Sequence, residues 1–349
     1  MLDSYKNITK AVALLVKPLS ARNRDIILRR FGLKTGRPET LEAIGQSYGI
    51  TRERVRQIEN HILKNLKADL AKVEVDAKPY FDFTAKTLSS QGGFMSEADL
   101  FSSFSGNANS NIHNLALAFL LSLPSDFQRV DESDNCHVFY ANGSEAVALA
   151  VSIISQVTDI FNKRKVLLVK DDLYGAYRNA NSRQAVASTA FFSAIKIAKE
   201  IDQNIFNEYG LVGWSEVKPR GVRDRAYLVL KRQSKPQHFR EITSLINTAS
   251  FTNKKANVQT VHNELIKDGR FVLVGRGIYG LSEWGYNAGT VKDVLVDILK
   301  RHGKALPKAE LINRVLSSRY VKPNTILLNL QDGKIFRKQA DGSYTLREA

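Results

Sequence analysis

Apolar residues between positions 20 and 67 recur every three or four positions in three short stretches, the spacing of helices with one buried side. A residue suited to cap a helix precedes each stretch, in the order Ser20, Thr40 and Thr51. Gly49 lies between the second and third stretches, where a tight turn requires the conformational freedom of glycine. Two short helices joined by such a turn predict a helix-turn-helix.

The last of these helices has two different sides when its residues are placed at about 100° per residue. The apolar side, which should face the core, carries Val55, Ile58, Ile62 and Leu66. The polar side carries Glu53, Arg56, Gln57, Asn60 and Lys64, with Arg52 and Arg54 at its flanks. Side chains near the N-terminus of a helix in the major groove can read base edges. A solvated helix face is the alternative and would suit Asn60 and Lys64, but base readout is favoured for the cluster in the first two turns.

The rest of the chain contains an order of elements that repeats. Near the C-terminus, a helix and a Pro-containing link precede two helices and a hairpin around Asp341-Gly342. The same order occurs earlier and ends in a hairpin around Gly275-Arg276-Gly277. Three helices followed by a hairpin predict a winged helix-turn-helix at both places. The two copies comprise residues 234–249 with 269–284, and residues 303–318 with 333–348.

Two weaker copies precede these, in residues 91–141 and 164–217, the second with a helix expected at 184–199. Chance similarity remains an alternative for these two. Four copies would fill the chain after residue 75 and would pack on one another, because such small modules are only marginally stable alone. The predicted fold is mainly α and multi-domain: an N-terminal helix-turn-helix followed by a tandem array of winged-helix modules with short β-hairpin wings. The predicted domains are 1–75, 76–141, 142–218, 219–286 and 287–349.

Charge is distributed unevenly along the chain, whose 51 Lys and Arg against 35 Asp and Glu give a formal net charge of +16. Residues 1–75 contain 15 basic and 8 acidic side chains, residues 76–160 contain 3 and 10, and residues 161–349 contain 33 and 17. Two basic blocks favour binding to nucleic acid, although many other cytoplasmic proteins are also basic. The acidic block should not bind nucleic acid. An acidic spacer domain is favoured there, and contact with a basic partner or inhibition of the basic blocks are the alternatives.

Residues 20–67 resemble region 4 of bacterial sigma factors of the housekeeping class. The resemblance depends on RDIILRRFGL (24–33), TLEAIGQSYGITRERVRQIE (40–59) and ILKNLK (62–67). It implies that the third helix reads the −35 promoter element, with base or phosphate contacts from Arg52, Glu53, Arg56 and Gln57. It also implies that the preceding helices can dock on the flap of the RNA polymerase β subunit. We recognise no counterpart of the aromatic helix that melts promoters in such factors, so we expect DNA reading without promoter opening.

Residues 222–284 resemble the winged-helix domain shared by the RNA polymerase delta subunit, certain restriction enzymes and eukaryotic chromatin regulators. The matching features are KPQHFREI, the VHNEL helix and the FVLVGRGIYGL hairpin. The resemblance implies a module that binds DNA or acts as a polymerase adaptor. The candidate phosphate contacts in its third helix and wing are Lys254, Lys255, His262, Lys267, Arg270 and Arg276. A solvated basic surface is the alternative.

No motif for catalysis or cofactor binding accompanies these features. The sequence lacks a GxxxxGK[ST] phosphate loop, and its six histidines are not at metal-ligand spacing. A single cysteine, Cys136, excludes an internal disulfide and a thiolate zinc finger, and in a strand its neighbour His137 would face the other way. We therefore expect no enzyme, no catalytic or metal-binding residue and no cofactor. The longest apolar run, residues 115–123, is about half a membrane span, so neither a membrane helix nor a signal peptide is expected.

These observations predict a cytoplasmic, nucleoid-associated bacterial or phage protein that binds double-stranded DNA. It would act as a transcription regulator or a sigma-like accessory factor. One alternative is an RNA polymerase adaptor whose contact with DNA is secondary. A second alternative is the DNA-recognition component of a restriction or defence system.

Overall fold

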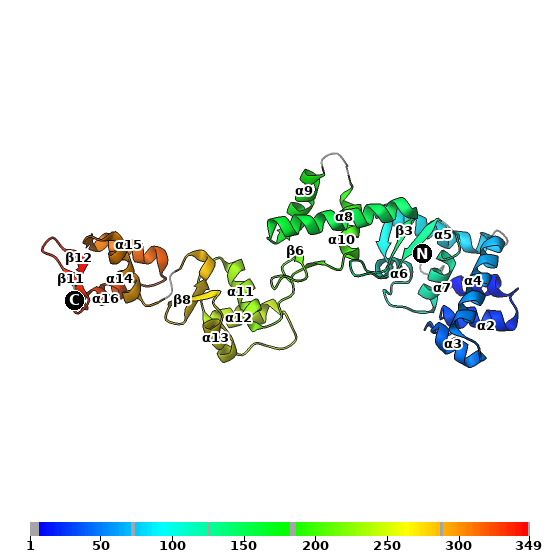
Figure 1. The fold of residues 1–349 in the computed structure, drawn as a ribbon, viewed down its shortest axis with the longest axis horizontal. Helices are drawn as coiled ribbons and strands as arrows, with labels where there is room; N and C mark the ends of the chain where they lie inside the picture. The colour runs from blue at the N-terminus through cyan, green and yellow to red at the C-terminus, as the bar shows by residue number, and fades with distance from the viewer. Residues whose placement is uncertain (1–6, 71–73, 125, 182–185, 287–288, 348–349) are drawn as a thin grey trace. The chain divides into compact units, whose positions relative to one another are not determined.

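The computed structural model describes residues 7–70, 74–124, 126–181, 186–286 and 289–347 (Figure 1). These residues form sixteen α-helices and four small antiparallel sheets of three strands each. The prediction of a mainly helical fold is therefore confirmed. The chain divides into two compact units, the first made of residues 1–203 and 208–212, the second of residues 204–207 and 213–349.

The three helices predicted within residues 20–67 begin where the sequence places them. They are α2 (Ala21–Arg30), α3 (Leu41–Tyr48) and α4 (Arg52–Asp69). They are preceded by α1 (Ile8–Val16), which the sequence analysis did not predict. The side chains of Ser20, Thr40 and Thr51 each accept a hydrogen bond from a backbone N–H in the first turn of α2, α3 and α4. Gly49 ends α3 in the left-handed conformation, with a φ of 65°. The predicted helix-turn-helix is thus confirmed as α3, the Gly49 turn and α4.

Four segments after α4 share one order of elements: a helix, a strand, two helices and a hairpin of two strands (Figure 1). In every sheet the last strand of the segment lies in the middle. The first repeat comprises α5 (Glu74–Ser90), β1 (Phe94–Ser96), α6 (Glu97–Ser105), α7 (Ile112–Leu121), β2 (Phe127–Val130) and β3 (Phe139–Asn142). The second comprises α8 (Gly143–Arg164), β4 (Leu168–Val169), α9 (Lys170–Ala180), α10 (Ser188–Ile197), β5 (Ile201–Gln203) and β6 (Glu208–Leu211).

The third and fourth repeats belong to the second compact unit. The third comprises α11 (Val222–Gln233), β7 (Gln237–His238), α12 (Phe239–Ala249), α13 (Val258–Lys267), β8 (Phe271–Gly275) and β9 (Ile278–Leu281). The fourth comprises α14 (Val291–His302), β10 (Leu306–Pro307), α15 (Lys308–Ser318), α16 (Pro323–Leu330), β11 (Phe336–Lys338) and β12 (Ser343–Leu346). The predicted boundary between them, at residues 286 and 287, touches positions outside the described residues.

The second repeat differs in detail from the sequence prediction. The helix expected at 184–199 is observed as α10, Ser188–Ile197, and its expected first residues lie outside the described residues. The hairpin expected within 204–217 begins earlier, because Ile201 of β5 enters the core and is only 3% exposed. The polar residues that follow Ile201 concealed this strand from the apolar pattern.

A tyrosine occupies the same register position in all four sheets. These residues are Tyr140, Tyr209, Tyr279 and Tyr344, each on the middle strand. Each pairs on one side with the residue two positions before the second helix of its repeat, and on the other side with a residue of its hairpin partner. The four segments therefore repeat one strand register as well as one order of elements.

The hydrophobic core formed by α1 and the second half of α4 continues into the first repeat, and it is separate from the core around Ile44 and Val55 of the helix-turn-helix. One cluster of buried residues contains Val12 and Leu15 of α1 together with Leu117 and Leu120 of α7. The cluster also joins α2 to α7, where the rings of Phe31 and Phe119 meet edge to face with centroids 5.0 Å apart. Residues before and after the predicted boundary at position 75 thus share apolar contacts.

Among the described helices, α8 is long and apolar enough to cross a membrane by length and composition. Core helices of soluble proteins meet the same criterion. One side of α8 is buried, through residues that include Ile153, Val157 and Phe161, and it packs against α10. Within the first unit, α8 is therefore the first helix of the second repeat, with its apolar side in the protein core.

Candidate nucleic-acid interface

The exposed face of α4 carries every residue that the sequence assigned to it. Val55, Ile62 and Leu66 are buried and Ile58 is half-buried, so the apolar side faces the core as predicted. The residues of α4 predicted to contact DNA are all exposed: Arg52, Glu53, Arg54, Arg56, Gln57, Asn60 and Lys64. The cap at Thr51 fixes the start of the helix, so the first of these side chains lie in its first turn.

Four of these exposed side chains bind one another in the free protein. Arg56 donates two hydrogen bonds to the carboxylate of Glu53, at 2.8 and 2.7 Å. Arg54 donates one to the side-chain oxygen of Gln57, at 3.1 Å. The hydrogen bond from Arg56 lowers the pKa of Glu53 below its usual value, which keeps this carboxylate ionised. Exposed pairs of this kind contribute little to stability. The same side chains can therefore leave these pairs and bind base edges or phosphates instead.

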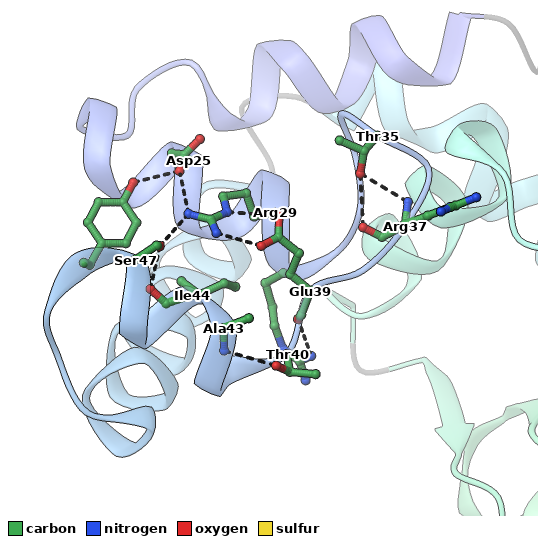
Figure 2. Close-up of polar contacts among 11 residues, drawn as sticks. Asp25, Arg29, Thr35, Arg37, Glu39, Thr40, Ala43, Ile44 and Ser47 are labelled. Atoms are coloured by element: carbon green, nitrogen blue, oxygen red, sulfur yellow. Dashed lines mark hydrogen bonds and ion pairs between the residues drawn. The ribbon is translucent and has the colours of Figure 1, made fainter.

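Polar contacts join α2 to the segment before α3 and to α3 itself (Figure 2), and a further contact joins α2 to α4. Arg29 donates two hydrogen bonds to Glu39, at 3.0 and 2.7 Å, and one to the hydroxyl of Ser47 at 2.7 Å. The neighbouring Arg30 contacts Glu59 of α4 at 3.2 Å. The hydrogen bond from Arg29 lowers the pKa of Glu39, so this pair stays charged. A bidentate pair has a defined geometry, and the three helices are therefore fixed relative to one another.

Sequence reasoning assigned no role to this network. The ion-pair partners lie 10 to 29 residues apart, which a periodicity of apolar positions does not detect. The available signal was the pair of arginines, Arg29 and Arg30, at the end of a short amphipathic helix, two residues before Gly32. Arginines there can contact the following helices as well as solvent.

The basic residues predicted in the third repeat lie on different elements. Lys254 and Lys255 are exposed between α12 and α13, Lys267 is exposed at the end of α13, and Arg276 is exposed in the turn between β8 and β9. His262 is half-buried, with its ring stacked on that of Phe239 at a centroid distance of 4.3 Å. The structure thus leaves the three lysines and Arg276 free to meet a polyanion and uses the imidazole in packing.

Arg270 is held inside the third repeat by two carboxylates. Its guanidinium lies 2.9 Å from Asp224 of α11 and 2.6 Å from Asp268, and both carboxylates are largely buried. Hydrogen bonding to Asp268, and then to Asp224, raises the pKa of Arg270 above its usual value, while the pKa of Asp268 is lowered by the same contact. This arrangement ties α11 to the start of the hairpin, which is a structural role.

Replacing Arg270 with Ala should destabilise the protein by about 1–3 kcal/mol at neutral pH, because two partly buried carboxylates lose their partner. The pKa of Asp268 in the folded state is lowered, so its stabilising contribution is present above about pH 4 and is lost as pH falls through the folded pKa. The difference in the free energy of unfolding between the parent protein and Arg270→Ala should therefore become smaller below about pH 4. Urea unfolding of the full chain at several pH values measures it. A difference that stays constant with pH would contradict the assignment.

The described residues contain no group of three or more His, Cys, Asp or Glu side chains that could hold a metal ion. Cys136 is buried, and burial raises the pKa of its thiol. It lies outside the strand in which the sequence placed it, because β3 begins at Phe139 and Cys136 forms an isolated bridge with Ala198. The thiol is therefore protonated at neutral pH and packed.

Comparison with known proteins identifies the N-terminal segment. Residues 15–68 match the family described as Sigma-70, region 4. The segment is 49% identical over 53 residues to the RNA polymerase sigma factor SigA1 of Synechococcus elongatus, covering 15% of this chain and 13% of the relative. It is 53% identical over 49 residues to the RNA polymerase sigma factors SigA of Nostoc and of Microcystis aeruginosa, covering 14% of this chain and 13% and 12% of the relatives.

The chain thus matches only about an eighth of the length of these curated relatives. The match begins near the end of α1 and ends near the end of α4, so it includes the whole helix-turn-helix. Residues 15–68 are therefore a sigma-70 region 4 domain, similar to that of housekeeping sigma factors, within a chain that continues well beyond it.

Proposed function

We propose that this protein is a transcription regulator that binds duplex DNA and reads a −35-type promoter element through α4. The observation that carries the proposal is the exposed cluster in the first two turns of α4, inside a domain that matches sigma-70 region 4. Arginine can donate two hydrogen bonds to guanine and glutamine can pair with adenine, so Arg56 and Gln57 have the chemistry for base readout. The protein would act on DNA in the bacterial cytoplasm.

We further propose that the four repeats are winged-helix modules. A helix, a strand, two helices and a hairpin whose last strand lies in the middle of the sheet is the arrangement such a module requires. In the third repeat, Lys254, Lys255 and Lys267 are exposed and have no carboxylate partner among the described ion pairs. They would contact phosphates and add affinity that is independent of sequence. The proposal leaves Arg270 out of this surface.

Docking of the helix-turn-helix on the polymerase flap is less favoured as the main role. The resemblance to region 4 implies that the helices before α4 could supply such a surface. The apolar side of α1, however, is buried against α7 in the core shared with the first repeat. DNA reading uses a face that is exposed in the chain as it stands, and flap docking on α1 would first require this core to open.

The proposal predicts that the protein does not open promoters. Opening traps unstacked bases, which usually requires exposed aromatic side chains. Among the described residues, Tyr320 is the one exposed aromatic side chain, whereas Phe271 and Tyr279 are buried and Phe31 and Trp284 pack against hydrophobic clusters. Core RNA polymerase with the full-length protein should therefore leave promoter thymines unreactive to permanganate, whereas a complete sigma factor serves as the positive control. Thymines that become reactive only when this protein is added would show that it is an initiation factor.

The contribution of the third repeat can be measured by the salt dependence of DNA binding. Replacing Lys254, Lys255 and Lys267 with Gln in the full chain should lower the log–log slope by up to about 2.7, at about 0.9 for each lost phosphate contact. The matched control replaces Lys78 and Lys86, which are exposed on α5 of the acidic first repeat, and should leave the slope unchanged. Equal slopes for the triple variant and the parent would exclude the third repeat from the DNA surface.

A further inference from the structure

A groove in the third repeat, with a volume of about 670 Å³, runs between α13 and the hairpin. A continuous row of rings forms its floor: His238, Phe239, His262 and Tyr279, with neighbouring ring centroids 4.4, 4.3 and 5.9 Å apart. Gly277 also lines the groove, and a Cβ there would come within 2.8 Å of the imidazole of His238. The groove is thus an aromatic surface next to a turn with little space for a larger residue.

Large aliphatic side chains line the groove and remain in contact with solvent. Ile266 of α13 is 63% exposed and Leu273 of β8 is 48% exposed. Isolated apolar residues on a surface need no explanation, but two of them beside a row of rings make a patch that typically meets a partner. Neither a phosphate nor most base edges would compensate for covering these side chains, whereas an apolar side chain of a protein would.

The charges around the groove have one sign. Of the nine lining residues, Arg240 and Arg276 are the charged ones, and none is acidic. Both arginines are exposed. Guanidinium groups form their strongest hydrogen bonds with carboxylates and phosphates, and the apolar floor between these two selects a carboxylate-bearing chain with a bulky apolar residue.

The equivalent groove of the second repeat has different chemistry, which argues against a common packing requirement. The fifth and ninth residues of the third helix are His262 and Ile266 in α13, but Phe192 and Lys196 in α10. The hairpin residue opposite the repeated tyrosine is Leu273 in the third repeat and Gln203 in the second. The fold therefore tolerates polar residues at these positions. Of the second and third repeats, the third has the exposed aliphatic pair.

We propose that this groove binds an acidic peptide segment of a partner protein, with a large apolar side chain placed between Ile266 and Leu273 and carboxylates on Arg240 and Arg276. Such docking would bring a second protein to the DNA site. It goes beyond the proposed DNA reading by α4 and does not depend on it.

Selection of displayed random twelve-residue peptides on the full-length protein tests this proposal. Enriched peptides should combine Asp or Glu with Leu, Ile, Phe, Trp or Met. Their affinity, measured with the synthetic peptides, should fall at least tenfold for Ile266→Glu and for the double variant Arg240→Glu, Arg276→Glu. The control Leu328→Glu changes an aliphatic residue of similar exposure, 66%, in the fourth repeat and should keep the affinity.

Further arms separate the possible failures. Circular dichroism establishes that each variant is folded. Arg56→Ala in α4 should leave peptide binding unchanged, so the groove proposal can be tested independently of the proposal that α4 reads DNA. The proposal is overturned if no enriched peptide depends on Ile266, or if the enriched peptides are basic. It is also overturned if Ile266→Ala weakens duplex DNA binding tenfold and the selected peptides are unaffected, because the groove would then belong to DNA.

Discussion

Replacing Phe119 with Ala should destabilise the first compact unit by about 3–5 kcal/mol, the usual effect of removing a fully buried aromatic side chain. Phe119 is 0% exposed and its ring contacts Phe31, which directly follows α2 in the sigma-70 region 4 domain. The lost contacts therefore lie on both sides of the predicted boundary at residue 75. Urea unfolding monitored by circular dichroism gives the change in free energy, and duplex binding near the unfolding midpoint should weaken in parallel.

The matched control for this variant lies on α1. Leu14 is 48% exposed, so Leu14→Ala removes a side chain of similar character without opening the core, and its effect should stay within about 0.5 kcal/mol. Specific DNA binding that survives unchanged at urea concentrations where Phe119→Ala has unfolded the first repeat would show that residues 8–69 fold alone. The core described above would then not couple the two segments.

Substitution of Arg56 or Gln57 with Ala should reduce discrimination between a specific and a random duplex, by about 1–3 kcal/mol for each lost bidentate contact. Total affinity for random DNA should change less, because phosphate contacts elsewhere supply it. The structure adds a refinement for Arg56, since its loss also frees the carboxylate of Glu53 to repel DNA. The double variant Glu53→Ala, Arg56→Ala separates this repulsion from the loss of the arginine.

Competition binding with specific and random duplexes at one salt concentration measures this discrimination. Lys64→Ala is the internal control, because Lys64 is exposed on the same face but farther from the N-terminus of α4. It should weaken binding to both duplexes by the same factor. An unchanged ratio of affinities for Arg56→Ala and Gln57→Ala would refute the assignment of base readout to α4.

Local signals explain what the sequence predicted well. The caps at Ser20, Thr40 and Thr51 and the left-handed Gly49 depend on residues within one helical turn, so their chemistry can be read directly. The polar face of α4 follows from helical periodicity alone. For the same reason, the hairpin around Gly275-Arg276-Gly277 was placed correctly, with β8 and β9 on either side.

Contacts between distant residues explain what the sequence did not predict. The apolar side of α1 packs against α7, about a hundred residues later in the chain. No local pattern in either segment predicts this contact. The sequence predicted Arg270 to be an exposed phosphate contact in the third repeat. Its partner Asp224 lies 46 residues earlier in the chain and becomes its neighbour only in the folded structure. The repeated tyrosine was likewise hidden, because it is defined by strand register and not by spacing along the chain.

The core shared by α1 and α7 also limits how such a gene can be rearranged. Recombination at a point between residues 70 and 76 would join the helix-turn-helix to a new partner that lacks the side chains covering Val12 and Leu15. The resulting protein would expose an apolar surface and tend to aggregate. Selection should therefore transmit the first compact unit, α1 through β6, as one heritable block, because α8 and α10 of the second repeat also pack against the sheet of the first repeat.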